Sequence, residues 1–581
     1  MAKASLLQLC RAAQNWSHRI DRHPQMPDNR FTYVAANSFT ALWTDPAPSE
    51  TWYQRGKIQN LRLAAARLNQ CIIPAGEVFS FWVQVGRASS HKGYVRGRML
   101  QEGCMIPAIG GGLCQLSNAL YQAALDAGCE IIERHPHSRI VPSSGTWERR
   151  DATVAWNYID LRFCAAMPLQ LQVQLTPSHL HVALLTTNQH SHTLAARSPN
   201  RRTPLYTLPI LSDYACESCG QVSCFRSDHH AFPLKSSPKK AFLLDTAWPE
   251  FIRYVKANHT DADEIAMPID GNRWNRPQYA WPTQGFATIH TATSATLLRS
   301  FRSRRLAEQG ARRQRAFLDG AKTLATQLAK KLDAQTDEVC VSQSLLPFLW
   351  SSGALGGRRI SILCTHLPAS VLQAELNRGF AQHPESTTLN DFRTEHWLAE
   401  AEDEALYYAE QIITPHGQIA ALFPDKSRLL EWSIPPHSSP ALRTRPSDQR
   451  SILFPCATLG RKGAYELREA IRGMNVRLLL GGKLLEDANF WDGFKTESAT
   501  PAALAETDLV IQPCIVESQP RALLRAIAAG VPVITTLNSG LHPGSPAHFV
   551  PSLDAAALHE SITARLTEQA TQMLSAQTPS H

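Results

Sequence analysis

The second half of the chain alternates short apolar runs with helical patterns, and this alternation is the strongest constraint on its fold. From about residue 240 to 550 the apolar runs are EVCVSQ, RISILC, QIITP, SILFPC, VRLLLGG, DLVIQP and VPVITT. Buried strands of parallel sheets have this composition, and the helices between them form the crossovers. The pattern therefore predicts doubly wound parallel α/β sheets from about residue 240 onward.

The first part of the chain follows a different pattern, and 581 residues are too many for a single core. The segment LQLQVQLTPSHLHVALL alternates apolar and polar residues, as half-buried antiparallel strands do. We expect an N-terminal extension at 1–54, an α+β domain at 55–187 and a polar, cysteine-rich linker at 188–239. The predicted fold class is thus α/β multidomain.

Composition favours a cytoplasmic protein. The N-terminal stretch lacks the apolar core of a secretory signal, and no segment approaches the ~20 apolar residues of a membrane span. Thirteen cysteines without a framework pattern fit a reducing compartment. The net charge of +8 permits an acidic partner without requiring one, and we expect no nucleic acid.

A glycine–cysteine turn is the first candidate site. The stretch IPAIGGGLCQLSNALYQAAL places Gly110–Gly112 one residue ahead of Cys114, which opens a predicted helix. Glycine backbone can approach a ligand closely, and a helix N-terminus lowers the pKa of a thiol. An anion-binding turn or a small buried thiol is the simpler alternative.

A nucleophilic thiol needs a base and a residue that orients the base. His137 is the predicted base, His135 is its alternative, and Asp151 at the start of the next strand is the predicted orienting residue. In order and in element type, Cys114, histidine and aspartate resemble transglutaminase-like and papain-like cysteine enzymes.

Several motifs in this region are similar to the VanW family, over roughly residues 55–175. They are NLRLAAARLNQCIIPAGEVFSF, VGRASSHKGYVRGRML, GGGLCQLSNALYQAALDAGCEIIERHPHS and DATVAWNYIDLRF. The family takes its name from a gene beside glycopeptide-resistance operons, so the resemblance implies a cell-envelope connection and no particular reaction. Gln115 and Glu133 belong to the same motifs, with helix-start solvation and a surface charge as their simpler interpretations.

The linker contains a compact cysteine cluster, CESCGQVSCFRSDHH. Its spacing suits tetrahedral metal ligation, with zinc favoured over an iron–sulfur cluster and unpaired cysteines as the alternative. The predicted ligands are Cys216, Cys219, Cys224 and His229, with His230 as the alternative fourth ligand.

The last 130 residues carry an ordered set of motifs that resembles the nucleotide-sugar-binding domain of GT-B glycosyltransferases of the retaining family 4 type, most clearly over 450–550. They are LFPCATLGRKGAYELREAI, RLLLGG and DLVIQPCIVESQPRALLRAIAAGVPVITTLNSGL. The resemblance implies a nucleotide-sugar donor. It also implies two Rossmann-like, doubly wound α/β domains of GT-B type, at residues 240–440 and 441–581.

Individual residues of these motifs take roles from that family. Lys462, beside Arg461, matches the lysine that contacts the donor diphosphate, and Glu517 matches the first glutamate of the E-x7-E signature, which holds the donor sugar. Ser518 forms the turn near the phosphates, and Gly481 ends the second strand. Arg525 stands where the second glutamate is expected, and the family arginine before the lysine falls on Ala457 or Thr458.

A basic segment, RSFRSRRLAEQGARRQR at Arg299–Arg315, also reads as helical. Gly310 weakens this helix, and a solvated face is the simpler interpretation. The alternatives are contacts with lipid head groups at a membrane surface, with nucleic acid or with phosphorylated sugars.

Together these features predict a VanW-like protein fused to a retaining hexosyltransferase that acts on a glycan or lipid-linked, envelope-related acceptor. One alternative is a Cys-dependent acyl transferase or peptidase in the front domain with a glycan-binding rear half. The other is a non-enzymatic protein that binds glycans or peptidoglycan precursors.

Overall fold

The computed structural model describes every residue except 1, 46–47, 102–103, 137–150, 188–238, 305, 307–309, 392, 435–448 and 578–581. The chain divides into two compact units. Unit 1 consists of Met1–Ala241, Leu332–Val339 and Leu349–Arg359. Unit 2 consists of Phe242–Lys331, Cys340–Phe348 and Ile360–His581.

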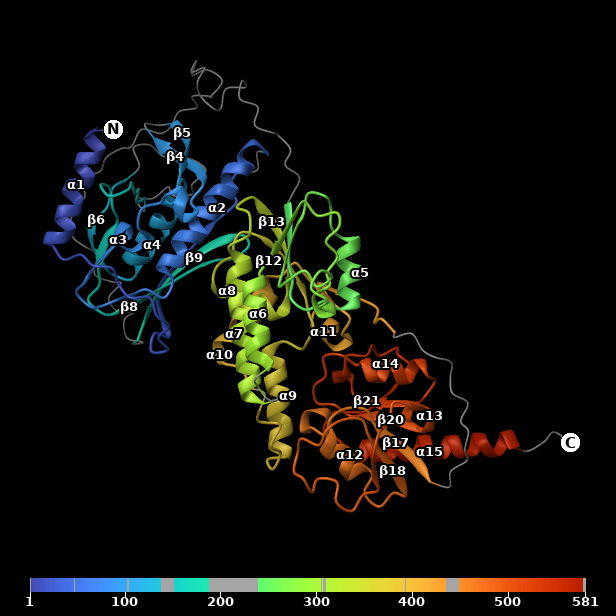
Figure 1. Ribbon diagram of the computed structural model, residues 1–581. Coiled ribbons are helices and arrows are strands. Elements are labelled where there is room, and N and C mark those ends of the chain that lie inside the picture. The colour runs from blue at the N-terminus through green and yellow to red at the C-terminus, as the bar shows by residue number, and fades with distance from the viewer. Residues whose placement is uncertain are drawn as a thin grey trace. The chain divides into compact units, whose positions relative to one another are not determined.

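Unit 1 combines helices with antiparallel strands (Figure 1). Its helices are α1 (Ala2–Ser17), α2 (Pro48–Leu68), α3 (Phe81–Val85) and α4 (Cys114–Asp126). The strand orders are β1-β9-β8-β2 in one sheet, β3-β7-β6 in a second and β4-β5 in a hairpin. The strands are β1 (Tyr33–Ala41), β2 (Ile72–Ile73), β3 (Val78–Ser80), β4 (Arg96–Gln101), β5 (Cys104–Ile109), β6 (Glu130–Glu133), β7 (Arg162–Cys164), β8 (Leu169–Leu175) and β9 (His179–Thr186).

The core of unit 1 forms where α2 packs on β8 and α4 packs on β1 and β9. Two later segments of the chain, Leu332–Val339 and Leu349–Arg359, also belong to this unit, and the second packs closely against it. The Gly357 N–H donates to Thr176 O at 2.8 Å, and Arg62 Nε donates to Gly356 O at 2.6 Å. Gly357 has φ +68°, and a Cβ there would lie 2.4 Å from Ile58 Cγ2, so no larger residue fits this approach.

A seven-stranded sheet has the order β12-β11-β10-β13-β14-β15-β16. In chain order this is 3-2-1-4-5-6-7, which begins with the strand order of a doubly wound sheet. Its strands are β10 (Lys239–Leu243), β11 (Glu264–Met267), β12 (Thr288–Thr291), β13 (Thr336–Ser342), β14 (Arg359–Leu363), β15 (Gln411–Thr414) and β16 (Ser427–Leu429). The helices of this region are α5 (Pro249–Ala257), α6 (Thr293–Arg304), α7 (Ala311–Ala329), α8 (Leu346–Ser351), α9 (Ala369–Gln382), α10 (His396–Tyr408) and α11 (Gly417–Leu422).

The last sheet has six strands in the order β19-β18-β17-β20-β21-β22, and all its neighbouring pairs are parallel. In chain order this is 3-2-1-4-5-6, so the strand order reverses between β17 and β20. The strands are β17 (Arg450–Phe454), β18 (Val476–Leu480), β19 (Thr496–Ser498), β20 (Leu509–Gln512), β21 (Val533–Thr535) and β22 (His548–Phe549). The helices are α12 (Ala464–Ala470), α13 (Ala503–Glu506), α14 (Arg521–Ala528) and α15 (Ala555–Gln577).

The predicted fold class is confirmed: an α+β region precedes two doubly wound α/β sheets in succession. The predicted domain limits stay a prediction. The basic segment is not one helix, because Gly310, with φ +105°, precedes a separate helix, α7. Among the described helices, none combines the length and the apolar character that crossing a bilayer requires.

Candidate functional site

Lys462 and Glu517 meet at the point where the strand order of the last sheet reverses. Lys462 ends the short turn Gly460–Lys462 after β17, and Glu517 lies in the loop after β20. Lys462 Nζ donates to Glu517 Oε2 at 2.5 Å, and each side chain is 12% exposed. Ligands of doubly wound proteins bind at this kind of crevice, outside the carboxyl ends of the strands.

The Glu517 carboxylate is held by further donors. Gln512 Nε2 donates to Oε2 at 2.6 Å, and the N–H groups of Ser518 and Gln519 donate to Oε1 at 2.8 and 3.2 Å. Burial raises the pKa of Glu517, but the Lys462 charge and these hydrogen bonds outweigh it, so the pKa is lowered overall. The carboxylate is therefore ionised and fixed in direction at neutral pH.

Arg461 joins the two loops through its backbone. Its carbonyl accepts the N–H groups of Ile515 and Val516 at 3.0 and 3.2 Å. Burial lowers the pKa of its guanidinium, and the charge of Glu517 opposes that shift. Two cationic side chains thus lie on the strand β17 side of the crevice.

The other predicted donor-site residues occupy different positions. Ser518 contributes its backbone N–H to Glu517. Gly481 directly follows β18, is exposed, and donates its N–H to the carbonyl oxygen of Phe454, the last residue of β17, at 2.8 Å. Arg525 is exposed on the second turn of α14.

His416, which the sequence analysis missed, fixes the Glu517 loop. Its ring is fully buried at the start of α11, where Nδ1 accepts the Ile419 N–H at 3.3 Å. The remaining nitrogen, Nε2, must then carry the proton, and it donates to the Glu517 carbonyl at 3.0 Å. Burial lowers the pKa of His416 to about 4, so the ring is neutral at physiological pH. A lone histidine in a strand-turn segment gives no pattern by which to find it.

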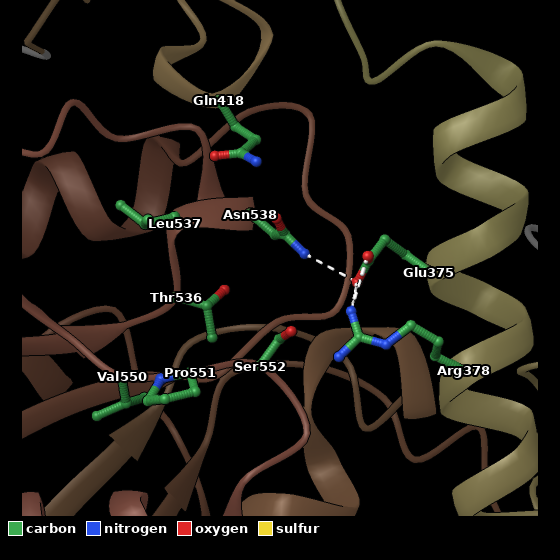
Figure 2. Close-up of a pocket in the computed structure, with 9 residues that line it drawn as sticks. All are labelled: Glu375, Arg378, Gln418, Thr536, Leu537, Asn538, Val550, Pro551 and Ser552. Atoms are coloured by element: carbon green, nitrogen blue, oxygen red, sulfur yellow. Dashed lines mark hydrogen bonds and ion pairs between the residues drawn. The ribbon is translucent and has the colours of Figure 1, made fainter. Parts of the chain in front are cut away.

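A cavity of about 340 Å³ opens beside this loop (Figure 2). Asn538 connects the two, because its carbonyl accepts the Glu517 N–H at 3.2 Å and its Nδ2 donates to Glu375 Oε2 at 3.3 Å. Glu375 also pairs with Arg378 at 2.9 Å on α9, and Figure 2 shows both side chains facing Asn538. The lining residues are Glu375, Arg378, Gln418, Thr536, Leu537, Asn538, Val550, Pro551 and Ser552.

A second missed feature is the pairing of Glu250 with Arg521. Both guanidinium Nη atoms lie 2.7 Å from the Glu250 carboxylate, whose side chain is completely buried. Burial raises the pKa of Glu250, but the bonds from Arg521 and the Ser433 N–H lower it overall. This pair joins the start of α5 to the start of α14.

In unit 1, Cys114 begins α4, as the sequence predicted. Its Sγ lies 3.5 Å from Thr153 Oγ1 and 3.9 Å from Val154 O. The preceding glycines allow close packing, because a Cβ on Gly112 would lie 2.2 Å from Lys57 Cγ. Burial lowers the pKa of Lys57 to about 8, and its Nζ lies 3.5 Å from Thr44 Oγ1. Nothing in the sequence spacing connected Lys57 to the turn.

The predicted partners of Cys114 are placed only in part. His137 lies outside the described residues. Thr153, the neighbour of Cys114, pairs across strands with His135. His135 Nε2 lies 3.2 Å from Glu133 Oε1, and its side chain is 46% exposed. The Asp151 backbone carbonyl accepts from Arg134 Nε at 2.7 Å.

Glu133 is more than a surface charge. Its side chain is 15% exposed and binds both Nη atoms of Arg11, at 2.6 and 2.7 Å. The Asp160 N–H donates to Oε1 at 3.1 Å. Gln115 binds Thr40 Oγ1 and Ala41 O at 3.0 and 2.8 Å rather than solvent alone. Glu133 and Gln115 therefore both form hydrogen bonds within the folded domain.

The predicted zinc ligands Cys216, Cys219, Cys224 and His229, with the alternative His230, lie outside the described residues and stay a prediction. Within the part of the chain that the structure describes, no group of three or more His, Cys, Asp and Glu residues is arranged to hold a metal ion.

Comparison with protein families identifies two segments. Residues 56–185 match the family model described as VanW like protein, and residues 463–568 match the one described as Glycosyl transferases group 1. The chain carries a VanW-like domain and a group 1 glycosyl transferase domain. The first match includes Cys114. The second includes Glu517 and begins one residue after Lys462.

Two curated relatives align with the VanW-like domain. The Vancomycin B-type resistance protein VanW of Enterococcus faecalis (strain ATCC 700802 / V583) is 35% identical over 135 residues, which is 22% of this chain and 48% of that protein. The uncharacterized protein YoaR of Bacillus subtilis (strain 168) is 35% identical over 109 residues, 19% of this chain and 35% of that protein. The chain thus spans half or less of the length of these relatives.

Among solved structures, sucrose-phosphate synthase from Thermosynechococcus elongatus aligns at 15% identity, covering 57% of this chain and 91% of that chain. The TM-score is 0.34. At this score the likeness carries no inference about the activity of the glycosyl transferase domain.

Proposed function

We propose that the second half of the chain transfers a sugar from a nucleotide-sugar donor to a glycan or lipid-linked acceptor of the cell envelope. The observation that carries the proposal is the Lys462–Glu517 contact at the strand-order reversal of a domain that matches group 1 glycosyl transferases. Transfer of a hexose with retention of configuration, and a cytoplasmic location, are part of the proposal.

The chemistry of such a transfer fits these side chains. The bond from the sugar to the donor phosphate breaks, and the diphosphate leaves with added negative charge. A hydroxyl oxygen of the acceptor forms the new bond to the sugar, and the proton of that hydroxyl is released to water. The positive charges of Lys462 and Arg461 lie where the negative charge of the diphosphate develops. Electrostatic stabilisation of the transition state by such fixed groups is usually the largest single contribution to catalysis. The ionised Glu517 accepts hydrogen bonds from sugar hydroxyls, and it shares the Lys462 ammonium with the diphosphate.

The neighbouring cavity offers groups suited to a sugar. Glu375 and Asn538 can accept and donate hydrogen bonds to hydroxyl groups, and Ser552 adds a hydroxyl of its own. We propose that this cavity binds the part of the sugar ligand that does not contact Glu517. Its volume lies in the range of ordinary small-molecule pockets, roughly 300–1,000 Å³.

Arg525 distinguishes this donor site from that of the family it resembles. An exposed guanidinium cannot accept the ribose hydroxyls as a glutamate would, but it can pair with a phosphate group. The proposal therefore assigns Arg525 to the nucleotide as a phosphate contact.

The test is a thermal-shift screen of UDP-, GDP-, ADP- and dTDP-sugars with the intact protein, followed by hydrolysis assays of any donor that binds. We expect one nucleotide class to stabilise the protein. Lys462→Ala should lose binding, and Glu517→Gln should keep the nucleoside diphosphate but lose about 10²- to 10³-fold in turnover.

Matched controls are Lys495→Ala and Glu497→Gln, which change exposed residues of the same sheet. They should bind and turn over like the unmodified protein. If no nucleotide sugar stabilises the protein, or if Lys462→Ala binds as tightly as the controls, the transferase proposal is wrong.

A thiol activity of the VanW-like domain is the second candidate, and the Cys114–Thr153–His135 arrangement favours it. In this alternative Cys114 is the nucleophile of an acyl transferase or peptidase, His137 or His135 its base and Asp151 the orienting residue, and the rear half binds a glycan. A protein that binds glycans without either activity is the third candidate.

A further inference from the structure

The helices α6 and α7 pack along each other (Figure 1). They present large apolar side chains to solvent. On α6, Leu297, Leu298 and Phe301 are 48%, 46% and 54% exposed, and Phe317 on α7 is 40% exposed. Their spacing of one, three and four residues puts the three α6 residues on one face. A surface helix normally turns its apolar face to the core, so this arrangement is reversed.

The inward face of α6 shows why these residues cannot rotate into the core. Thr296 Oγ1 donates to Pro268 O at 2.7 Å, and Arg299 Nη1 pairs with the buried Asp245 at 2.9 Å. Gly320 of α7 leaves room for this arginine, since a Cβ there would lie 2.9 Å from Arg299 Cγ. Arg299 is thus an anchor of the helix and does not belong to its exposed surface.

Exposed arginines stand at the end of α6 and at the start of α7. Arg302 and Arg304 are exposed at the end of α6, and Arg312 and Arg315 are exposed at the start of α7. Among the described residues from 297 to 319, Asp319 is the one acidic side chain. The surface therefore combines the exposed apolar side chains of α6 with arginines of both helices. We call it the basic hairpin surface, made of Leu297, Leu298, Phe301, Arg302, Arg304, Arg312 and Arg315. Phe317 is not part of it, because it is two and five residues from Arg315 and Arg312 and so lies on another face of α7.

We propose that the basic hairpin surface binds an anionic lipid bilayer. Its apolar side chains enter the interfacial region, while its arginines pair with lipid phosphate groups. A second copy of the chain fits less well, because a two-fold contact would bring the same arginines together. The inference concerns where the protein acts, and it does not depend on sugar transfer.

The test is flotation of the full chain with vesicles of phosphatidylcholine alone and with one quarter phosphatidylglycerol, without any nucleotide sugar. We expect binding to the anionic vesicles, at least tenfold weaker binding to neutral ones, and release between 0.1 and 0.5 M salt. Arg302→Glu with Arg312→Glu, and separately Leu298→Ser with Phe301→Ser, should each weaken binding at least tenfold.

The matched controls are Arg253→Glu with Arg472→Glu, and Leu429→Ser, which change exposed residues of unit 2 outside this surface. They should float like the unmodified protein, and all variants should melt within a few degrees of it. The proposal is wrong if the protein does not float with anionic vesicles, or if the control variants lose as much vesicle binding as the hairpin variants. It is also wrong if the protein is a dimer in solution and the hairpin variants bind vesicles less only because they no longer dimerise. Tighter binding to RNA than to vesicles would also contradict it.

Discussion

Lys462 Nζ lies 2.5 Å from Glu517 Oε2, with both side chains nearly nine-tenths buried. Removal of one partner leaves the other charge buried without its main counter-charge, which costs more than removal of both. The Lys462–Glu517 ion pair therefore stabilises the fold and holds both charged groups at the crevice beside β17 and β20.

A double-mutant cycle tests that relationship. We expect Lys462→Met to destabilise the protein by about 3–5 kcal/mol, because Glu517 then stays ionised in a buried site. Adding Glu517→Gln should restore part of this loss, because the uncompensated charge is gone. Urea unfolding at pH 7.5 measures both. Equal stability of the single and double variants would contradict the prediction.

His416 predicts an acid-dependent loss of stability. Its folded pKa of about 4 lies below the value of about 6.5 for an unfolded histidine, so the unfolded chain takes up the proton first. The contribution of the neutral ring is complete above pH 6.5 and falls as the pH drops towards 4. Between pH 7 and 5 the loss should be about 2 kcal/mol.

The measurement is urea unfolding at pH 7.0 and 5.0, compared with His416→Gln, which lacks the titrating ring. The variant should be less stable at pH 7.0 but should lose about 2 kcal/mol less between the two pH values. His396→Gln, which changes an exposed ring, is the control and should follow the unmodified protein. A pH dependence that is unchanged in His416→Gln would rule out this role.

Gly112 gives a prediction with an internal control. Gly112 and Gly76 have similar positive φ values, +93° and +77°, but a Cβ would strike Lys57 at Gly112 and meet nothing within 4 Å at Gly76. Gly76→Ala should cost about 1–2 kcal/mol from backbone strain alone. Gly112→Ala should cost at least about 1 kcal/mol more, because Lys57 must move. Thermal unfolding of both variants checks this, and equal costs would show that the Lys57 contact is unimportant.

Cys114 should be the more reactive of two comparable thiols. Cys114 begins a helix, whereas burial raises the pKa of Cys164 on β7, and both are partly exposed. We expect iodoacetamide at pH 6.5 to alkylate Cys114 at least tenfold faster, and His137→Ala to slow it if that histidine is the base. Peptide mass spectrometry gives both rates. Labelling of the two cysteines at the same rate would exclude an activated Cys114.

The cysteine cluster predicts one bound zinc per chain. Elemental analysis of the purified protein should find it, and Cys216→Ser with Cys219→Ser should lose it, because two of four thiolate or imidazole ligands are removed. Cys10→Ser, at an exposed position outside the cluster, is the control. A metal-free protein that stays metal-free after incubation with zinc would refute the site.

The sequence predicted the doubly wound sheets well, because buried parallel strands leave a local signal in every apolar run. It also predicted α4 and its start at Cys114, because helical spacing and the glycine turn are local features. Lys462 and Glu517, which lie 55 residues apart, were predicted as site residues from the resemblance to a glycosyltransferase family.

Other parts of the site could not be predicted from local pattern. His416 contacts Glu517 from 101 residues away, and Arg521 contacts Glu250 from 271 residues away. These contacts form because the two sheets of unit 2 pack together, and the spacing of residues along the sequence does not reveal them. In the basic segment, Gly310 weakens the helical pattern in the sequence, and the structure shows that it precedes a separate helix with a φ of +105°.

The contacts of Gly356 and Gly357 with Arg62 and Thr176 have a consequence for biosynthesis. Unit 1 is interleaved with later sequence, so its first 241 residues leave the ribosome before the segment that closes against Ile58 exists. The nascent VanW-like domain must keep that apolar surface from aggregating until residue 359 has emerged. This topology implies that the chain depends on chaperones during synthesis. It also implies that chains truncated in the linker do not accumulate in the cell.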